Sequence, residues 1–433
     1  MTKRTLANTL CSLLLLTPLI SHAEILAMVN YDSIPGQSPR KEGIAILNVD
    51  PDSPQFGKII NDLPLPPDAL SHHIFYNKDL SKAYITALGN GPLRVINMKR
   101  KPYVIELLDV PECQVSEDMA FTADKKSWYL TCMGSSNVIV GDAQTDKVKQ
   151  VIAADGKDTF IRYPHGIGLH EDINRMIITS TVRPADLGDA GETVTVIEAT
   201  SGKVLSTHKL SDKPSPSGSA PVEAVFVPHA NPPMAYVATM FEGKLWSAIW
   251  QVNHHTFDFQ SVYDFADVKQ GVPLEIYFNQ RHNRLYVTTA NPGALNIFDI
   301  SGESVTKPVL LKSIPTAGGA HHVVFSPDEK YAFVENKFLN LPKMDDGSIT
   351  VIDLQKMEKK TSIDTLKNKG LKPHDIYMLP PWHTDDAHYS HLIKKWSTFK
   401  LVKQKILRGR YDTQNTPSAP GTSRSEGLAK AVL

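Results

Sequence analysis

The sequence predicts an all-β protein, a seven-bladed β-propeller closed by pairing of its N- and C-terminal strands. Three observations lead to this prediction. A unit of short strands separated by turns recurs at intervals of roughly 45 to 55 residues, which is typical of four-stranded propeller blades. The last unit, "HDIYMLP" from His374, has no second strand after it. Conversely, "EILAMVNYD" and "EGIAILNVD" near residues 24–50 have no first strand of their own, and a closed ring explains both incomplete ends.

The repeated units match one another to different degrees. The unit "HHIFYNKDLSKAYITALGNGPLRVINM" from His72 aligns without a gap, through its first turn, with "HHVVFSPDEKYAFVENK" from His321. Looser copies begin at Glu117, His165, Val222 and Leu274. A β-sandwich or an open solenoid is the alternative, but the two incomplete ends fit a closed ring better.

Composition and the first residues bound the class of protein. The 433 residues include 46 basic and 46 acidic side chains, so no basic excess points to nucleic acid as a partner. The chain begins "MTKRTLANTLCSLLLLTPLISHA", with two basic residues, a short apolar run and a small-x-small ending at Ala23. This is the pattern of a secretory signal peptide. We therefore expect cleavage near Ala23, a periplasmic or secreted protein, and no transmembrane segment, because the apolar run is too short to span a bilayer.

These patterns divide the chain into four parts. Residues 1–23 are the expected signal peptide and 24–380 the propeller. Residues 381–411 carry apolar side chains among lysines at helical spacing, which predicts an amphipathic helical extension. Its basic part, 388–410, either caps the propeller or contacts a membrane surface or a partner. Residues 412–433 lack the apolar content to fold, and we expect a disordered tail.

Histidines and carboxylates recur at the start of the first strand of each unit. Because the innermost strands of all blades begin at one mouth of the central channel, these positions converge on the axis. Neutral imidazoles facing carboxylates are what a transition-metal site requires. Polar residues lining a water-filled channel are the alternative, and alternation along a strand leaves open which member of each histidine pair faces the channel. The candidate metal ligands are His72, His73, His165, His321, His322, His374, Glu117, Glu223 and Glu275.

Two further groups of residues are candidate sites. Once the signal peptide is removed, only Cys113 and Cys132 remain, and in an oxidising compartment we expect a disulfide between them. Thiolates contributing to a copper site are the alternative. His383, Asp385, Asp386, His388 and His391 cluster after the propeller, where a hydrated helix start with acidic first-turn residues explains them and a metal is the alternative.

Short motifs resemble two known groups of proteins. "SPDEKYAFVEN" followed by "GSITVIDLQKMEKKTSI" resembles YVTN-type propeller repeats. The His-His pair that opens one blade, with "PLEIYF" in another and "KPHD" after "GSITVIDL", is similar to the selenium-binding protein and methanethiol oxidase family. That resemblance implies a β-propeller, copper dependence as in the methanethiol oxidases, and His72, His73 and His374 as candidate ligands. The family's paired-cysteine motif after the His pair is absent from "HHIFYNKDLSK", so the substrate does not carry over.

Two function hypotheses follow from these features. The first is a copper-dependent oxidoreductase that takes a small-molecule substrate at the channel mouth; zinc is a second candidate metal, because neutral imidazole accepts both. The second is a non-catalytic propeller that binds a protein or glycan through its long loops, "RPADLGDAGET" and "SDKPSPSGSAP". No catalytic residue is assigned, and no motif for an organic cofactor occurs.

Overall fold

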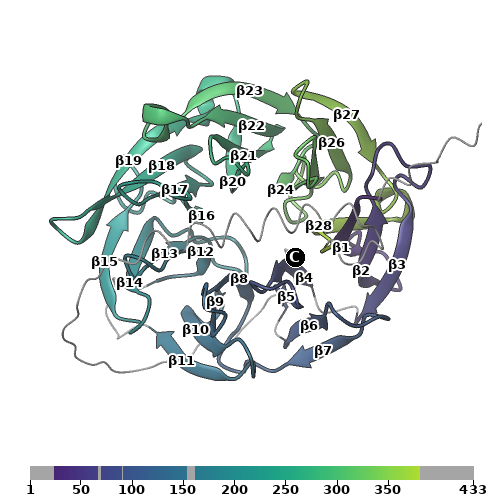
Figure 1. Cartoon of the computed structure of the whole chain (residues 1–433), viewed down its shortest axis with the longest axis horizontal. Coiled ribbons are helices and arrows are strands. Elements are labelled where there is room, and N and C mark those ends of the chain that lie inside the picture. Colours follow the sequence, from purple (N-terminus) through teal and green to yellow (C-terminus); the bar gives the residue numbers. More distant parts are fainter. Residues whose placement is uncertain (1–23, 67–69, 90, 154–160, 381–433) are drawn as a thin grey trace, which may run out of the picture. The chain divides into compact units, whose positions relative to one another are not determined.

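The computed structural model describes residues 24–66, 70–89, 91–153 and 161–380. Within them, strands β1 to β28 form seven four-stranded sheets, and each sheet is one blade of a ring (Figure 1). The predicted fold class is confirmed. The expected signal peptide, the helical extension with its His383–His391 cluster, and the tail fall outside the described residues and stay predictions.

The first three blades follow the chain from the innermost strand outward. Blade 1 contains β4 (Ser71–Tyr76), β5 (Lys82–Ala87), β6 (Leu93–Asn97) and β7 (Ile105–Leu108). Blade 2 contains β8 (Ser116–Phe121), β9 (Ser127–Cys132), β10 (Asn137–Asp142) and β11 (Val148–Ala153). Blade 3 contains β12 (Pro164–His170), β13 (Arg175–Ser180), β14 (Thr193–Glu198) and β15 (Val204–Lys209).

The next three blades repeat this order. Blade 4 contains β16 (Pro221–Phe226), β17 (Met234–Thr239), β18 (Lys244–Gln251) and β19 (Thr256–Asp264). Blade 5 contains β20 (Gly271–Phe278), β21 (Arg284–Asn291), β22 (Gly293–Asp299) and β23 (Val309–Pro315). Blade 6 contains β24 (Ala320–Phe325), β25 (Tyr331–Asn336), β26 (Ile349–Asp353) and β27 (Glu358–Ile363).

The seventh blade joins the two ends of the propeller. Its innermost strand, β28 (Leu371–Met378), pairs with β1 (Leu26–Ser33), which is followed outward by β2 (Glu42–Asn48) and β3 (Ile59–Leu65). Val29 of β1 lies opposite Ile376 of β28, and both are buried. The ring closure predicted from the two incomplete ends is confirmed.

Burial along each blade explains why these segments form strands. Second strands such as β17 are buried at every position, because both of their faces pack against neighbouring blades. Outer strands such as β11 are mostly exposed or half-buried. The core therefore lies between blades. The short 3-10 helices η1 (Phe265–Val268), η2 (Gly302–Val305) and η3 (Lys367–Lys369) are the only helices of the described residues, and none of these could span a membrane.

Each inner strand carries a β-bulge near its start. In blade 1, pairing jumps from Ser71 opposite Ala87 to Ile74 opposite Ile85, so His72 and His73 together face Thr86 alone. The same shift occurs in the inner strands of the other six blades. A bulge places two residues against one and interrupts the alternation of side chains. The inner strands lie nearest the centre of the ring (Figure 1), so the bulges lie around the channel.

Candidate metal centre

The bulges decide which member of each histidine pair faces the channel: both do. The rings of His72 and His73 stack with centroids 4.0 Å apart, and those of His321 and His322 are 3.9 Å apart. Two rings at such a short distance must lie on the same side of the strand. The sequence left this open because regular alternation would send successive side chains to opposite sides.

Side chains from the second strands hold the bulged backbone in place. Thr179 accepts the backbone N–H of Gly166 (2.8 Å) and donates to the carbonyl of Val222 in the next blade (2.9 Å). The Thr131 hydroxyl likewise accepts the backbone N–H of Asp118 (2.9 Å) and donates to the carbonyl of His165 (2.6 Å). Each such side chain satisfies a backbone group that the bulge leaves without its ladder partner.

Asn30 performs the same task where the ring closes. Its Oδ1 accepts the N–H of Asp375 (2.7 Å), and its Nδ2 donates to the carbonyl of His72 (2.6 Å). The Asp375 carboxylate in turn accepts the N–H of Ile74 in blade 1 (2.6 Å). The backbone that carries His72 is therefore fixed by blade 7, so the His pair is preorganised by ring closure.

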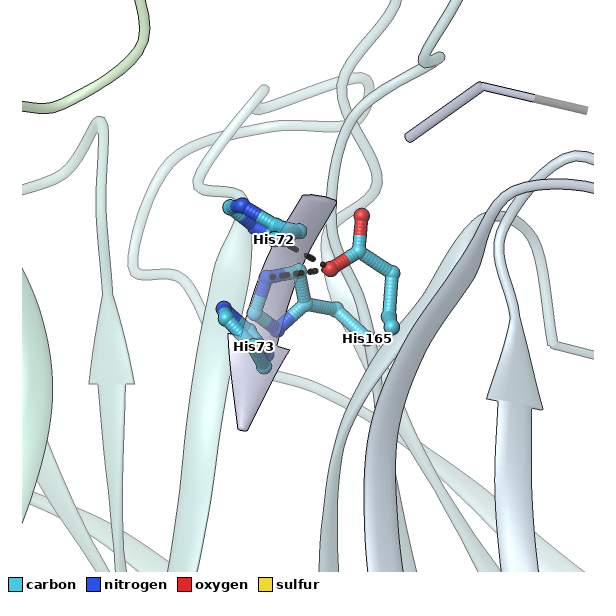
Figure 2. A group of neighbouring side chains, drawn as sticks. His72, His73 and His165 are labelled. Atoms are coloured by element: carbon cyan, nitrogen blue, oxygen red, sulfur yellow. Dashed lines mark ion pairs between the residues drawn. The ribbon is translucent and has the colours of Figure 1, made fainter. Parts of the chain in front are cut away.

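The first group of converging ligand atoms comes from blades 1, 2 and 3. One ligand atom each from His72, His73, Glu117 and His165 lies within 4.8 Å of all the others. Glu117 Oε2 is 3.3 Å from His72 Nε2 and 3.6 Å from His165 Nε2, the ion pairs dashed in Figure 2. In Figure 2 the dashed lines join this carboxylate to His72 and His165, and the His73 ring lies next to those two rings. All four side chains are buried.

A second group shares His73 with the first. Ligand atoms of His73, His321 and His322 also lie within 4.8 Å of one another. Carboxylates stand beside the imidazoles of the sixth blade: His322 Nδ1 is 3.4 Å from Asp375 Oδ1, and His321 Nε2 is 3.5 Å from Glu275 Oε1. For His322, the acidic neighbour at Nδ1 favours the N–H there and leaves Nε2 as a donor to a metal. His321 has carboxylates at both ring nitrogens, because its Nδ1 lies 3.9 Å from Glu335 Oε2.

Burial sets the protonation of this cluster. It lowers the pKa of His72, His73 and His322 well below the usual value, and the pKa of His165 to about 4. These four imidazoles are therefore neutral at neutral pH, the form that binds metals. Burial also raises the pKa of the Glu117 carboxyl well above its usual range. A cation in the cluster would favour the charged carboxylate and offset this desolvation.

The donor set fits a transition metal. Several fully enclosed atoms have no hydrogen-bond partner within the described residues: His72 Nδ1, His73 Nε2, His165 Nδ1, His322 Nε2 and both oxygens of Glu117. Buried polar atoms without partners are costly unless something binds them. Imidazole nitrogens with one carboxylate are ligands suited to copper or zinc.

Three of the predicted ligands lie outside both groups. His374 is buried in the channel wall, where its Nε2 contacts Lys337 Nζ and lies 3.1 Å from Asp32 Oδ1. Glu275 flanks His321, as described above. Glu223 occupies the equivalent position in blade 4 and lines a cavity on the far side of the channel.

The sequence analysis missed Asp32, Glu335 and Lys337. Lys337 is completely buried, and its Nζ donates to Asp32 Oδ1 at 2.7 Å. Burial lowers the pKa of Lys337 and opposes ionisation of Asp32, but His374 and Lys337 keep the pKa of Asp32 below its usual value. Glu335, fully buried, lies opposite the His321–His322 bulge. A charged residue near the end of an otherwise apolar second strand is the pattern that could have revealed them. The repeat was aligned on the first strands, which do not contain these residues.

Cys113 and Cys132 form a disulfide, with Cα atoms 5.2 Å apart. Cys132 is the last residue of β9, and Cys113 lies just before β8. Both sulfurs are used in this bond, and neither cysteine belongs to a group of converging ligand atoms in the described residues. The structure thus has the disulfide, and not the thiolates, of the two alternatives.

Comparison with known proteins rests on structure. No protein-family model and no curated protein sequence matches the chain. A hypothetical selenium-binding protein from Sulfolobus tokodaii is similar with a TM-score of 0.66 and 12% identity, over 83% of this chain and 94% of that one. The periplasmic gluconolactonase of Pseudomonas aeruginosa is similar with a TM-score of 0.57 and 12% identity, over 82% and 99% of the two chains.

This likeness shows the fold. At such identities it transfers no chemistry, because one fold carries many functions. The resemblance to selenium-binding proteins drawn from short motifs agrees with the structural likeness, whereas the YVTN-type repeat stays a prediction.

Proposed function

We propose that the chain is an exported β-propeller that binds a transition metal, copper first, in its axial histidine cluster, and that it acts as a small-molecule oxidase of the methanethiol oxidase type. One observation carries the metal site: His73 belongs to two groups of buried ligand atoms, each within 4.8 Å. The residues that would hold the metal are His73 with His72, Glu117 and His165, or His73 with His321 and His322.

Bound copper would supply one-electron redox chemistry between its two oxidation states, which imidazole ligands support. The chain's own residues do the rest. Glu117 places a carboxylate between two imidazoles, and the carboxylates of Asp375 and Glu275 orient the sixth blade's imidazoles. Burial excludes bulk water, which strengthens each of these electrostatic contacts.

The metal content of the exported protein, purified without affinity histidines, tests the site. We expect copper near one per chain, and its loss in His73→Ala, which removes the ligand common to both groups. The matched control is His229→Ala with His282→Ala, a pair whose rings are 5.2 Å apart in turns away from the cluster. Zinc in place of copper would reassign the metal. A chain that stays metal-free after dialysis against both would overturn the site.

Oxidase activity is a separate measurement. Oxygen consumption is followed with small thiols as electron donors, and copper-loaded chain is compared with zinc-loaded chain and His73→Ala. We expect turnover by the copper form alone. Copper-loaded chain without turnover on any reduced small molecule would contradict the oxidase, while a metal-free chain would favour binding through loops 183–193 and 211–221.

Export is tested at the N-terminus. We expect the protein recovered from outside the cytoplasm to begin at Glu24, as N-terminal sequencing or intact mass would show. A first residue of Met1 in that fraction would contradict the proposed cleavage.

A further inference from the structure

The channel mouth on the histidine side is covered by the segment that follows β25. The Phe338 ring lies 5.5 Å from the His321 ring. Leu339, from blade 6, packs against Leu88 and Met133, which follow the second strands of blades 1 and 2. The segment therefore reaches across the mouth, and the buried pair of Lys337 and Asp32 anchors its start.

The opposite side of the channel is hollow. A cavity of about 380 Å³ lies where the inner strands of blades 1 to 4 end, beside Tyr377 of β28. Its volume falls within the range of small-molecule sites. This cavity, unlike the covered mouth, offers room for a ligand close to the axis.

Two carboxyls line the cavity near the axis. Asp118 and Glu223 are the second bulge residues of blades 2 and 4, and both line the cavity at its axial end. Asp118 Oδ2 accepts the N–H of Ile167 at 2.9 Å, which fixes its position. Glu223 is 91% buried, since its exposed fraction is 9%. Burial, followed by the neighbouring carboxyls of Asp118 and Glu275, raises its pKa well above the usual value.

Aromatic side chains form the walls. Phe75, Phe121 and Phe226 line the cavity from three blades. Tyr76 lines it as well, is nine-tenths buried, and its hydroxyl has no hydrogen-bond partner among the described residues. Lys78 and Glu171 line the cavity as well, so its charged groups are the carboxyls of Asp118, Glu171 and Glu223 and one ammonium. Aromatic faces attract cations, and the excess of carboxyls favours a positively charged group.

We propose that this cavity binds a small organic cation, an alkyl- or arylalkylammonium ion, with its nitrogen against Asp118 and Glu223 and its apolar part among the aromatic rings. The site does not depend on the metal: it uses neither group of converging ligand atoms. Burial favours the neutral acids, raising the pKa of Asp118 to about 7, and a bound cation would favour the ionised carboxylates instead. A neutral molecule of the same shape, or an anion, cannot form these charge-assisted hydrogen bonds.

Calorimetric titration of the full chain, with and without metal, tests this. The probes are 2-phenylethylammonium, the neutral 2-phenylethanol, which has the same shape, and the anion 3-phenylpropanoate. We expect the ammonium to bind at least roughly tenfold more tightly than the alcohol, and the anion not to bind. Glu223→Gln should weaken ammonium binding by about tenfold or more while leaving metal content unchanged, and exposed Glu358→Gln on β27 should leave binding unchanged.

A second variant guards against misfolding of the first. Phe226→Leu keeps an apolar wall but removes an aromatic face, and we expect weaker ammonium binding with unchanged affinity for the alcohol. The proposal is overturned if alcohol and ammonium bind equally, if no probe binds, or if folded Glu223→Gln binds the ammonium like the unmodified chain. None of these outcomes bears on the metal content, so failure here and failure of the metal site are distinguishable.

Discussion

At the scale of single residues, the cluster depends on His73. It is the one side chain common to both groups of converging atoms, and its ring stacks on His72 and lies edge-on to His322 at 4.7 Å. Its Nε2 is enclosed and has no hydrogen-bond partner among the described residues. A buried imidazole of this kind is costly unless a ligand meets it, which is the physical basis of the proposed site.

Glu117 gives the site a pH dependence. Burial raises its carboxyl pKa well above the usual value, so the metal-free site holds a proton that a metal must displace. His72, His73 and His165, with lowered pKa values, release none near neutral pH. We expect copper affinity to fall as pH is lowered, because the raised pKa of Glu117 means that a proton leaves its carboxyl on binding. Glu117→Gln should abolish that release, as calorimetry in two buffers would show; an unchanged release would contradict this role.

Lys337 stabilises the channel wall through a buried ion pair. Lys337→Met leaves Asp32 buried beside His374, and among the described residues Arg40, at 3.3 Å, is then its one Lys or Arg partner. We expect a loss of about 3 kcal/mol in the free energy of unfolding by urea. The control is Lys330→Met, whose partner Asp52 has a 58% exposed side chain and whose loss should cost under about 1 kcal/mol. Equal losses would contradict the assignment.

At the scale of elements, the bulged start of each inner strand matters most. The bulge turns both members of each histidine pair to the channel. In five blades a threonine or asparagine on the second strand accepts a backbone N–H of the bulge, whereas in blade 4 the opposite residue is Ala238. Gly166 shows how closely the blades approach there, because a Cβ at this position would lie 2.5 Å from the Val222 carbonyl oxygen. Seven such bulges surround the channel and carry the aligned histidines and carboxylates.

Thr179 and Thr195 form a matched pair for testing this. Both are fully buried, but Thr179 makes the two hydrogen bonds described above, whereas Thr195 Oγ1 has no partner among the described residues. We expect Thr179→Val to destabilise the fold by about 1–3 kcal/mol and Thr195→Val to be neutral or stabilising. Chemical unfolding measures both. Equal effects of the two substitutions would show that the hydrogen bonds of Thr179 contribute nothing to stability.

How far the sequence could be interpreted also belongs to this scale. The repeat located the inner strands because each unit carries a histidine or carboxylate at its start and an aromatic or aliphatic residue a few positions later, as at His72 and Phe75. It could not locate the bulges, since a bulge is defined by pairing with the second strand and leaves no change in composition. Glu335 and Lys337 escaped prediction because they reach the channel from the second strand β25 and from the residue after it, whereas the repeat was aligned on the first strands.

At the scale of the whole propeller, ring closure by β28 and β1 should make the blades unfold together. Ile376 of β28 is 1% exposed and packs in the cluster that joins blades 6 and 7. We expect Ile376→Ala to cost about 2–5 kcal/mol. The free energy of opening measured by hydrogen exchange should fall by the same amount at protected amides of β13 in blade 3 and of β2 in blade 7. Acceleration confined to blade 7 would contradict cooperative closure.

The central claim is that imidazoles on the channel axis bind a metal. Pulsed electron paramagnetic resonance of the copper(II)-loaded chain tests it most directly, because it counts the imidazole nitrogens coupled to the metal. We predict more than one coupled imidazole in the unmodified chain, an altered count in His73→Ala, and no change in the His229→Ala, His282→Ala control. A spectrum without imidazole coupling, or one identical in the unmodified chain and His73→Ala, would contradict the account.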